Sequence, residues 1–188
     1  MATPSKARAT YQDLLNVPDH KVAEIVDGDL YASPRPAGRH TLAASSLGAI
    51  LTSAFQHGRG GPGGWWILFE PELHLAEDIL VPDFAGWKRQ RMPQVPDAAH
   101  FTLVPDWVCE VLSPSTERLD RVEKLRVYAR EGVAHAWLLN PIARTLEVLR
   151  REPGRWLLVA THGDDALVRA EPFEAIEIDL LDLWGETR

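Results

Sequence analysis

Residues 106–124 read DWVCEVLSPSTERLDRVEK, and this stretch decides the fold. The apolar residues between Trp107 and Leu112 include the β-branched Val108 and Val111, which predicts a strand buried on both faces. One acidic residue, Glu110, interrupts the run. A carboxylate removed from water needs a metal, a cation or several hydrogen-bond donors, or else its pKa shifts until it is neutral. We therefore expect Glu110 to have a partner.

The residues that follow predict a turn and then a helix. Ser113 to Thr116 end the strand, and Ser115 or Thr116 can cap a helix that has Glu117 in its first turn. This helix carries Lys124, a cation that can fold back towards the strand. One interpretation is a purely structural pair between Glu110 and Lys124; the other is that both belong to a functional site.

A second acid, Asp83, favours the functional interpretation. It follows Pro82 in the apolar run 79–87, and proline cannot donate to a β-ladder, so Pro82 indicates a strand edge, a bulge or a strand beginning. The alternative is an aspartate at a strand end that hydrogen-bonds the local backbone. If the strands of Asp83 and Glu110 are neighbours, two carboxylates converge, and oxygen ligands of this kind suit Mg²⁺ or Mn²⁺. A nearby lysine can stabilise charge that develops on a phosphate.

The remaining pattern predicts an α/β fold, with a mixed β-sheet flanked by helices. Thr10 caps a short helix, Asp27-Gly28 suits a type I′ turn, and a strand interrupted at Pro71 forms a hairpin with the next. A strand that follows a crossover helix lies parallel to its predecessor. The predicted helices are residues 10–18, 39–57 and 117–131; the predicted strands are 22–26, 30–32, 65–75, 79–87, 107–112, 136–139, 145–150 and 156–160, with a final strand or short helix in 176–183.

Length and composition predict one domain. The 188 residues suffice for a single core, which we place at residues 10–184, with a flexible N-terminus at 1–9 and a tail at 185–188. No apolar run approaches the roughly 18 residues of a membrane span, and the N-terminus has no apolar core of a secretory signal. The one cysteine, Cys109, is expected to be a buried apolar residue, and the expected location is the cytoplasm.

The formal net charge of -7 argues against a protein that coats nucleic acid with positive charge, but it does not exclude a nuclease. Local cations can hold a phosphate backbone. The candidates are Arg118, Arg121, Lys124, Arg126 and Arg130 on the predicted helix, and Lys88, Arg89 and Arg91 after Asp83. The alternative is a solvated face with pairs such as Glu117 to Arg121.

Several motifs together resemble the Uma-type putative restriction endonuclease family, a branch of the PD-(D/E)XK nuclease superfamily. They are Pro82-Asp83, Glu110 in CEVLSPST, Lys124 in EKLRVYAREGV, the following AWLLNP, and EIVDGDLYASPRP with His40 beyond it. The match runs from about Tyr11 to Leu158. CEVLSPST with its helix is the specific part, because Pro-Asp alone is too short to identify a family.

The resemblance implies a restriction-endonuclease-like fold and metal-dependent hydrolysis of DNA. Carried over, Asp83 and Glu110 would bind the metal, Lys124 would be the catalytic lysine, and Glu24 would be an additional acid. The superfamily's lysine commonly lies two residues after the second acid, where this chain has Leu112. Lys124 must therefore come from the helix. Asn140 also stands where relatives often have Asp before a proline, and we expect this difference to affect only a turn.

We therefore expect a Mg²⁺- or Mn²⁺-dependent endonuclease that acts on DNA, with Asp83, Glu110, Lys124 and Glu24 in its site. The alternative is a nucleic-acid or protein binding module that keeps the fold without turnover. Paired carboxylates also serve glycoside hydrolases, but the lysine and the metal-like grouping disfavour that class. A homodimer would fit cleavage of both strands of a duplex.

Overall fold

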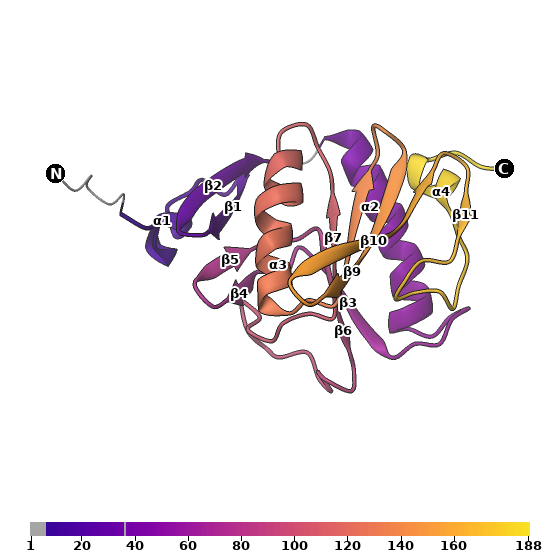
Figure 1. Ribbon diagram of the computed structural model, residues 1–188, viewed down its shortest axis with the longest axis horizontal. Helices are drawn as coiled ribbons and strands as arrows, with labels where there is room; N and C mark the ends of the chain where they lie inside the picture. Colours follow the sequence, from indigo (N-terminus) through magenta and orange to yellow (C-terminus); the bar gives the residue numbers. More distant parts are fainter. Residues whose placement is uncertain (1–6, 36) are drawn as a thin grey trace.

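The computed structural model describes residues 7–35 and 37–188, and a six-stranded mixed sheet forms its centre (Figure 1). The prediction of a flexible N-terminus falls, for residues 1–6, outside the described residues. The order of the central strands is β10-β9-β8-β7-β6-β3. Their bounds are β3 Trp65–Phe69, β6 Phe84–Lys88, β7 Trp107–Val111, β8 His135–Asn140, β9 Thr145–Glu152 and β10 Arg155–Gly163. The predicted α/β class, with a mixed sheet flanked by helices, is confirmed.

Strand β7 lies inside this sheet and is buried along its whole length. It pairs antiparallel with β6 and parallel with β8, as expected for a strand-helix-strand unit. Trp107, Cys109 and Val111 pack on the side of α2 (Gly38–Leu51), while Val108 packs on the side of α3 (Leu125–Glu131). Figure 1 shows the sheet between these two helices. Glu110 shares the parity of Val108, so its carboxylate faces the helix that carries Lys124.

A second sheet has the order β2-β1-β5-β4 among the described residues. Its strands are β1 Lys21–Val26, β2 Asp29–Pro34, β4 Leu73–Leu75 and β5 Asp78–Leu80. Asp27 and Gly28 both have positive φ, 51° and 86°, as the predicted type I′ turn between β1 and β2 requires. Helix α1 (Tyr11–Leu15), with Thr10 as its N-cap, precedes this hairpin as predicted.

The predicted hairpin between 65–75 and 79–87 is confirmed in its antiparallel pairing, but it does not stay within one sheet. The structure divides these residues into two hairpins in different sheets, with β3 paired to β6 and β4 paired to β5. The chain leaves the central sheet after β3 and returns to it at β6. Pro71 and Pro82 lie at the two crossings, where a residue without a ladder N–H is tolerated. Asp83 consequently lies at the junction of the two sheets.

Both predicted long helices change their hydrogen-bond pattern along their length. Helix α2 continues as a π-helical turn, η1 (Thr52–Gln56), and α3 is preceded by another, η2 (Leu119–Lys124). The three-residue spacing of Leu119, Val122 and Leu125 predicts that all three face inward, but the wider π turn shifts the phase of the side chains and Val122 is 51% exposed. Asp120, Lys124 and Tyr128 are buried instead. Helix α3 ends at Gly132, which has a φ of 97°.

The C-terminal residues complete the core on the α2 side. A short pair of strands, β11 (Leu167–Val168) and β12 (Ile178–Asp179), leads into α4 (Leu180–Trp184), which packs with α2. The expectation of a strand or short helix in 176–183 is confirmed. None of the helices in the described part of the chain is long and apolar enough to cross a membrane.

Candidate active site

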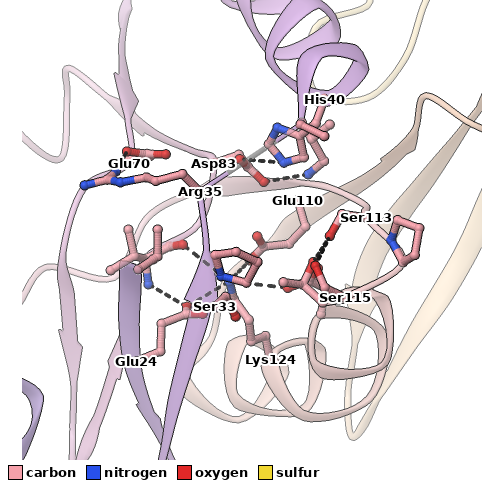
Figure 2. A pocket seen from close by; sticks show the side chains of 18 residues that line it. Glu24, Ser33, Arg35, His40, Glu70, Asp83, Glu110, Ser113, Ser115 and Lys124 are labelled. Atoms are coloured by element: carbon pink, nitrogen blue, oxygen red, sulfur yellow. Dashed lines mark hydrogen bonds and ion pairs between the residues drawn. The ribbon is translucent and has the colours of Figure 1, made fainter. Parts of the chain in front are cut away.

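A pocket of about 260 Å³ contains all four residues that the sequence analysis assigned to the site (Figure 2). Glu24 comes from β1, Asp83 from the segment between β5 and β6, Glu110 from β7 and Lys124 from η2. The pocket thus lies where the two sheets and the helix meet. Whether these residues are catalytic stays a prediction, but the structure places them in one pocket.

Lys124 is the centre of the buried charges. Its Nζ lies 2.8 Å from Glu24 Oε1 and 3.0 Å from Glu110 Oε1. A third carboxylate oxygen, Asp120 Oδ1, is 3.5 Å away, one turn earlier on the same helix. The side chain of Lys124 is only 3% exposed. The lysine therefore compensates the charge of the acids inside the protein. It is not a surface cation for a phosphate backbone, as the sequence analysis had also suggested.

The chain around Pro82 is held by the same residues. The Val81 N–H donates to Glu24 Oε1 over 2.8 Å, and Nζ of Lys124 donates to the Val81 carbonyl over 3.3 Å. Pro82 itself has no N–H and therefore needs no acceptor. Glu24 and Lys124 thus fix the residue two places before Asp83 as well as lining the pocket.

Two donors orient the carboxylate of Asp83. The Val111 N–H donates to Oδ2 over 2.8 Å, and His40 Nε2 lies 3.1 Å from Oδ1. His40 is in the first turn of α2 and is 8% exposed. Burial lowers the pKa of His40, but Asp83 and Asp120 outweigh burial and raise it above its ordinary value. The contact with Val111 links Asp83 directly to the strand of Glu110.

Asp120 and Tyr128 belong to this site although the sequence analysis did not include them. Tyr128 Oη donates to Glu110 Oε1 over 2.6 Å, and both residues are buried. Asp120, Lys124 and Tyr128 recur every four residues in the sequence. This four-residue repeat of polar side chains marks the buried face of the helix. The sequence pattern instead predicts that the neighbouring apolar residues form the buried face.

Burial and neighbouring charges together shift the pKa values of the ionisable groups in the pocket. Burial raises the pKa of Glu110 well above its ordinary value, and Lys124 opposes this effect only in part. Burial also raises the pKa of Asp120 to about 6. For Lys124, burial lowers the pKa, but Glu110 and Glu24 outweigh burial and raise it well above its ordinary value. Lys124 is therefore charged at neutral pH, whereas Glu110 and Asp120 retain protons more strongly than free carboxyls do.

The donor set fits a divalent cation that prefers oxygen. The carboxylates of Glu24, Glu110 and Asp120 contact the Lys124 ammonium, and the carboxylate of Asp83 lines the same pocket beside His40. The contacts of Glu110 with Lys124 and Tyr128 both use Oε1, and Glu110 lines the pocket. Excess buried negative charge of this kind is stabilised by a hard cation such as Mg²⁺ or Mn²⁺.

The rim of the pocket is polar. In the turn after β7, the hydroxyl of Ser113 forms hydrogen bonds with the hydroxyls of Ser115, over 3.0 Å, and Thr116, over 2.9 Å. On the opposite side, Arg35 forms an ion pair with Glu70 over 3.4 Å (Figure 2). Because the Arg35 side chain is 55% exposed, it is a cation at the pocket that remains accessible to an anionic ligand.

Most of the predicted backbone-binding cations have partners within the protein. Arg121 contacts Glu147 over 2.6 Å and Glu117 over 2.9 Å, the intrahelical pair named above as the alternative. Arg126 and Arg130 both pair with Asp27. Arg89 lies over the ring of Trp66, and Arg91 pairs with Asp106. Arg118 pairs with Glu123 over 3.6 Å, and its side chain is 80% exposed.

Comparisons with known proteins agree with this geometry. A family model named Uma2, described as "Putative restriction endonuclease", matches residues 8–181. A solved structure from Anabaena variabilis, described as a putative nuclease belonging to DUF820, is similar with a TM-score of 0.75 and 23% sequence identity. The similarity covers 94% of this chain and 98% of that one. At this identity the likeness supports the fold. No curated protein matched the chain.

Proposed function

We propose that this chain, which belongs to the Uma2 family of putative restriction endonucleases, is a metal-dependent endonuclease that hydrolyses phosphodiester bonds of DNA. The observation that supports the proposal most is the contact of Lys124 with Glu24 and Glu110 inside a pocket that Asp83 also lines. Burial of several carboxylates around one cation is costly for stability, and such clusters concentrate at functional sites.

In this proposal Asp83 and Glu110 would hold Mg²⁺ or Mn²⁺. When bound, such an ion polarises the phosphodiester and lowers the pKa of a coordinated water. Asp83 offers a carboxylate already oriented by His40 and the Val111 N–H, and Glu110 one held by Tyr128. Because these partners set the carboxylates before any ligand arrives, little reorganisation is needed on binding.

Lys124 would face the reacting phosphate beside Glu110, since both residues line the pocket. Its ammonium is held by Glu24, Glu110 and the Val81 carbonyl, so its position does not depend on the substrate. A fixed positive charge near a phosphoryl group stabilises negative charge that develops in the transition state. Glu24 acts through Lys124 in this scheme, as a positioning residue.

DNA would approach from the open side of the pocket, at the serine and threonine turn and Arg35. Since the formal net charge is -7, attraction of a polyanion depends on such local cations and on the bound ion. Cleavage of both strands of a duplex would be served by two copies around a two-fold axis, and a homodimer is part of the proposal.

The test is nicking of supercoiled DNA in Mg²⁺ or Mn²⁺ by Glu110→Gln. This change keeps the size of the side chain and removes its charge. We expect nicking to fall to background while the circular dichroism spectrum and thermal midpoint stay close to those of the wild type. Glu77→Gln, an exposed acid paired with Arg8, is the matched control and should nick normally. Undiminished nicking by Glu110→Gln would contradict the proposal and favour a binding module without turnover.

A further inference from the structure

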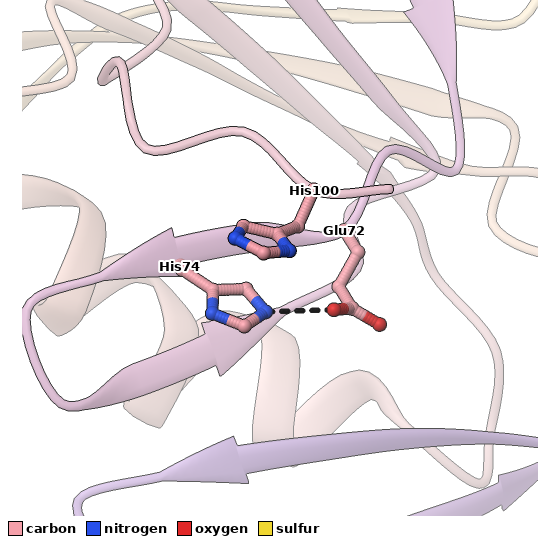
Figure 3. A group of neighbouring side chains, drawn as sticks. All are labelled: Glu72, His74 and His100. Atoms are coloured by element: carbon pink, nitrogen blue, oxygen red, sulfur yellow. Dashed lines mark hydrogen bonds and ion pairs between the residues drawn. The ribbon is translucent and has the colours of Figure 1, made fainter. Parts of the chain in front are cut away.

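A second cluster of potential metal ligands lies outside the pocket described above. Among the residues that the structure describes, Glu72, His74 and His100 form the one group of three or more His, Cys, Asp or Glu side chains whose ligand atoms all lie within 4.8 Å of one another (Figure 3). None of the three lines the pocket of Asp83 and Glu110. The group contains two imidazoles and one carboxylate, whereas the potential ligands that line the pocket are carboxylates and the imidazole of His40.

The three side chains are already close. His74 Nε2 is 2.7 Å from Glu72 Oε1, and the rings of His74 and His100 stack with centroids 3.9 Å apart and planes inclined by 17°. The side chains of His74 and Glu72 are 21% and 25% exposed. The cluster is thus half-buried and reachable from solvent, which leaves room for a water as a further ligand.

The backbone holds the cluster from both sides. Glu72 and His74 are two residues apart at β4, so their side chains point to the same face. The segment with His100 runs parallel to them, because His74 N–H donates to the Phe101 carbonyl over 2.9 Å and Phe101 N–H donates to the Glu72 carbonyl over 2.8 Å. Two segments far apart in sequence are therefore fixed side by side at the point where the three side chains meet.

A residue from a third segment supports the carboxylate. Tyr11 Oη donates to Glu72 Oε1 over 3.0 Å, and the ring of Tyr11 lies edge-on to that of His74, with centroids 5.1 Å apart. An outer hydrogen bond of this type orients a ligating carboxylate and is a regular feature of metal sites in proteins. Tyr11 belongs to α1, so this contact also joins the N-terminal helix to β4.

We propose that Glu72, His74 and His100 form a second metal site, which takes a transition-metal ion of the Zn²⁺ class rather than Mg²⁺. Two imidazole nitrogens and one carboxylate oxygen are a ligand set that Zn²⁺ accepts, and Mg²⁺ prefers oxygen donors. The site is separate from the proposed catalytic metal and does not depend on it.

Binding requires a small rearrangement of the side chains. Nearly parallel imidazoles cannot both direct a nitrogen lone pair at one ion, so at least one ring must turn about its Cβ–Cγ bond, a torsion with broad wells. The ligand atoms, which all lie within 4.8 Å of one another, must also settle at about 3.3 Å, the spacing around a tetrahedral ion. For His74 Nε2 and Glu72 Oε1, now 2.7 Å apart, this means a small separation. The hydrogen bond between His74 and Glu72 is exchanged for bonds to the metal, and any proton in it is released.

The expected consequence is a clamp on the long connection between β6 and β7. His100 lies on this connection and Glu72 lies beside β4, so a shared ion joins the connection to the four-stranded sheet. A ligand that binds only the folded protein stabilises it in proportion to the logarithm of its concentration. Zn²⁺ should therefore raise the thermal midpoint, and Mg²⁺ at the same concentration should not do so through this site.

The test is calorimetric titration of the metal-free full chain with Zn²⁺, with Co²⁺ absorption as a spectroscopic readout. All titrations are made in the Asp83→Asn background, so that the catalytic pocket does not contribute. We expect one ion per chain and visible Co²⁺ bands typical of a low-coordinate site. His74→Gln and His100→Gln should each weaken binding by at least about 10-fold, and Tyr11→Phe should weaken it to a smaller extent.

His57→Gln is the matched control, because His57 is exposed and lies outside the cluster. It should bind Zn²⁺ like its parent. Absence of Zn²⁺ binding, or binding that His100→Gln leaves unchanged, would overturn the proposal. Binding that appears only when Asp83 is restored would also overturn it, because the ion would then belong to the other pocket. None of these three results bears on nicking by Glu110→Gln, so the two proposals fail independently.

Discussion

The ammonium of Lys124 lies 3.0 Å from Oε1 of Glu110, in an interior where both side chains are 3% exposed. The two residues are separated by a turn and a π-helical segment, and their contact joins the central strand to the helix that covers it. A paired buried charge of this kind is tolerated, but loss of Lys124 leaves several buried carboxylates uncompensated. Loss of the Glu110 charge alone leaves Lys124 paired with Glu24 and Asp120. Stability and the proposed activity consequently depend on the same atoms.

Replacing Lys124 with Met should destabilise the fold. Methionine keeps most of the length of the side chain, but Glu24, Glu110 and Asp120 lose their buried cation. We expect a loss of about 3–5 kcal/mol in the free energy of unfolding, measured with urea at pH 7.5. The exposed Lys21→Met on β1 is the control and should change it by less than about 0.5 kcal/mol.

Adding Glu110→Gln to Lys124→Met should restore part of the lost stability, because one of the uncompensated acids is then neutral. A double variant that is less stable than the single variant would contradict this electrostatic account. The account would also be contradicted if Lys124→Met lost less than about 1 kcal/mol of stability, because a loss that small is typical of an exposed ion pair.

The stability conferred by Asp120 should depend on pH. The pKa of this carboxyl is raised from 3.8 to about 6 in the folded protein, with burial as the main cause. The folded state therefore binds its proton more tightly than the unfolded state, so ionisation destabilises the fold above about pH 6. This penalty disappears as the pH falls towards 4. Asp120→Asn, which mimics the neutral form, should raise the free energy of unfolding at pH 8 by up to about 3 kcal/mol.

The measurement is urea unfolding of Asp120→Asn and wild type at pH 8 and pH 4.5. The difference between them should shrink markedly at the lower pH. Asp97→Asn, at an exposed position between β6 and β7, should show no such trend. A gain of equal size at both pH values would mean that the amide improves packing or hydrogen bonding, and would contradict the assignment to charge.

His40 should act on metal binding through Asp83. Its Nε2 is 3.1 Å from Asp83 Oδ1, and His40→Ala removes this contact without removing the carboxylate. We expect the Mg²⁺ concentration for half-maximal nicking to rise about 10–100-fold, with the maximal rate largely recovered at saturating Mg²⁺. Thr41→Ala, one residue further along α2 and exposed, is the control. A lower maximal rate at every Mg²⁺ concentration would contradict a purely positioning role.

The parts of the site that leave a local pattern in the amino-acid sequence could be predicted from that sequence. An acid inside an apolar strand has few ways to be satisfied, so Glu110 and its need for a cation could be predicted directly. The strand-helix-strand unit followed from the handedness of crossovers. Asp83 was visible because a proline precedes it, and Glu24 came from the family resemblance alone.

Other features depend on three-dimensional packing. Alternation of apolar residues in 65–75 and 79–87 suits a strand in either sheet, so it could not reveal that the two halves of each run belong to different sheets. The π turn at Leu119–Lys124 leaves no pattern of its own, which is why Val122 was assigned to the inner face and Asp120 was missed. His100 meets Glu72 and His74 only because a parallel bridge brings a loop to β4.

The most direct test of the central claim is calorimetric titration with Mg²⁺ and Mn²⁺ of the wild type and of Asp83→Ala, with DNA nicking followed in the same samples. The account predicts that the wild type binds an ion and nicks DNA, and that the variant, still folded by circular dichroism, does neither. A wild type that binds neither ion, with or without DNA, would contradict it. Glu110 and Lys124 would then be a structural pair in a protein that binds without cleaving.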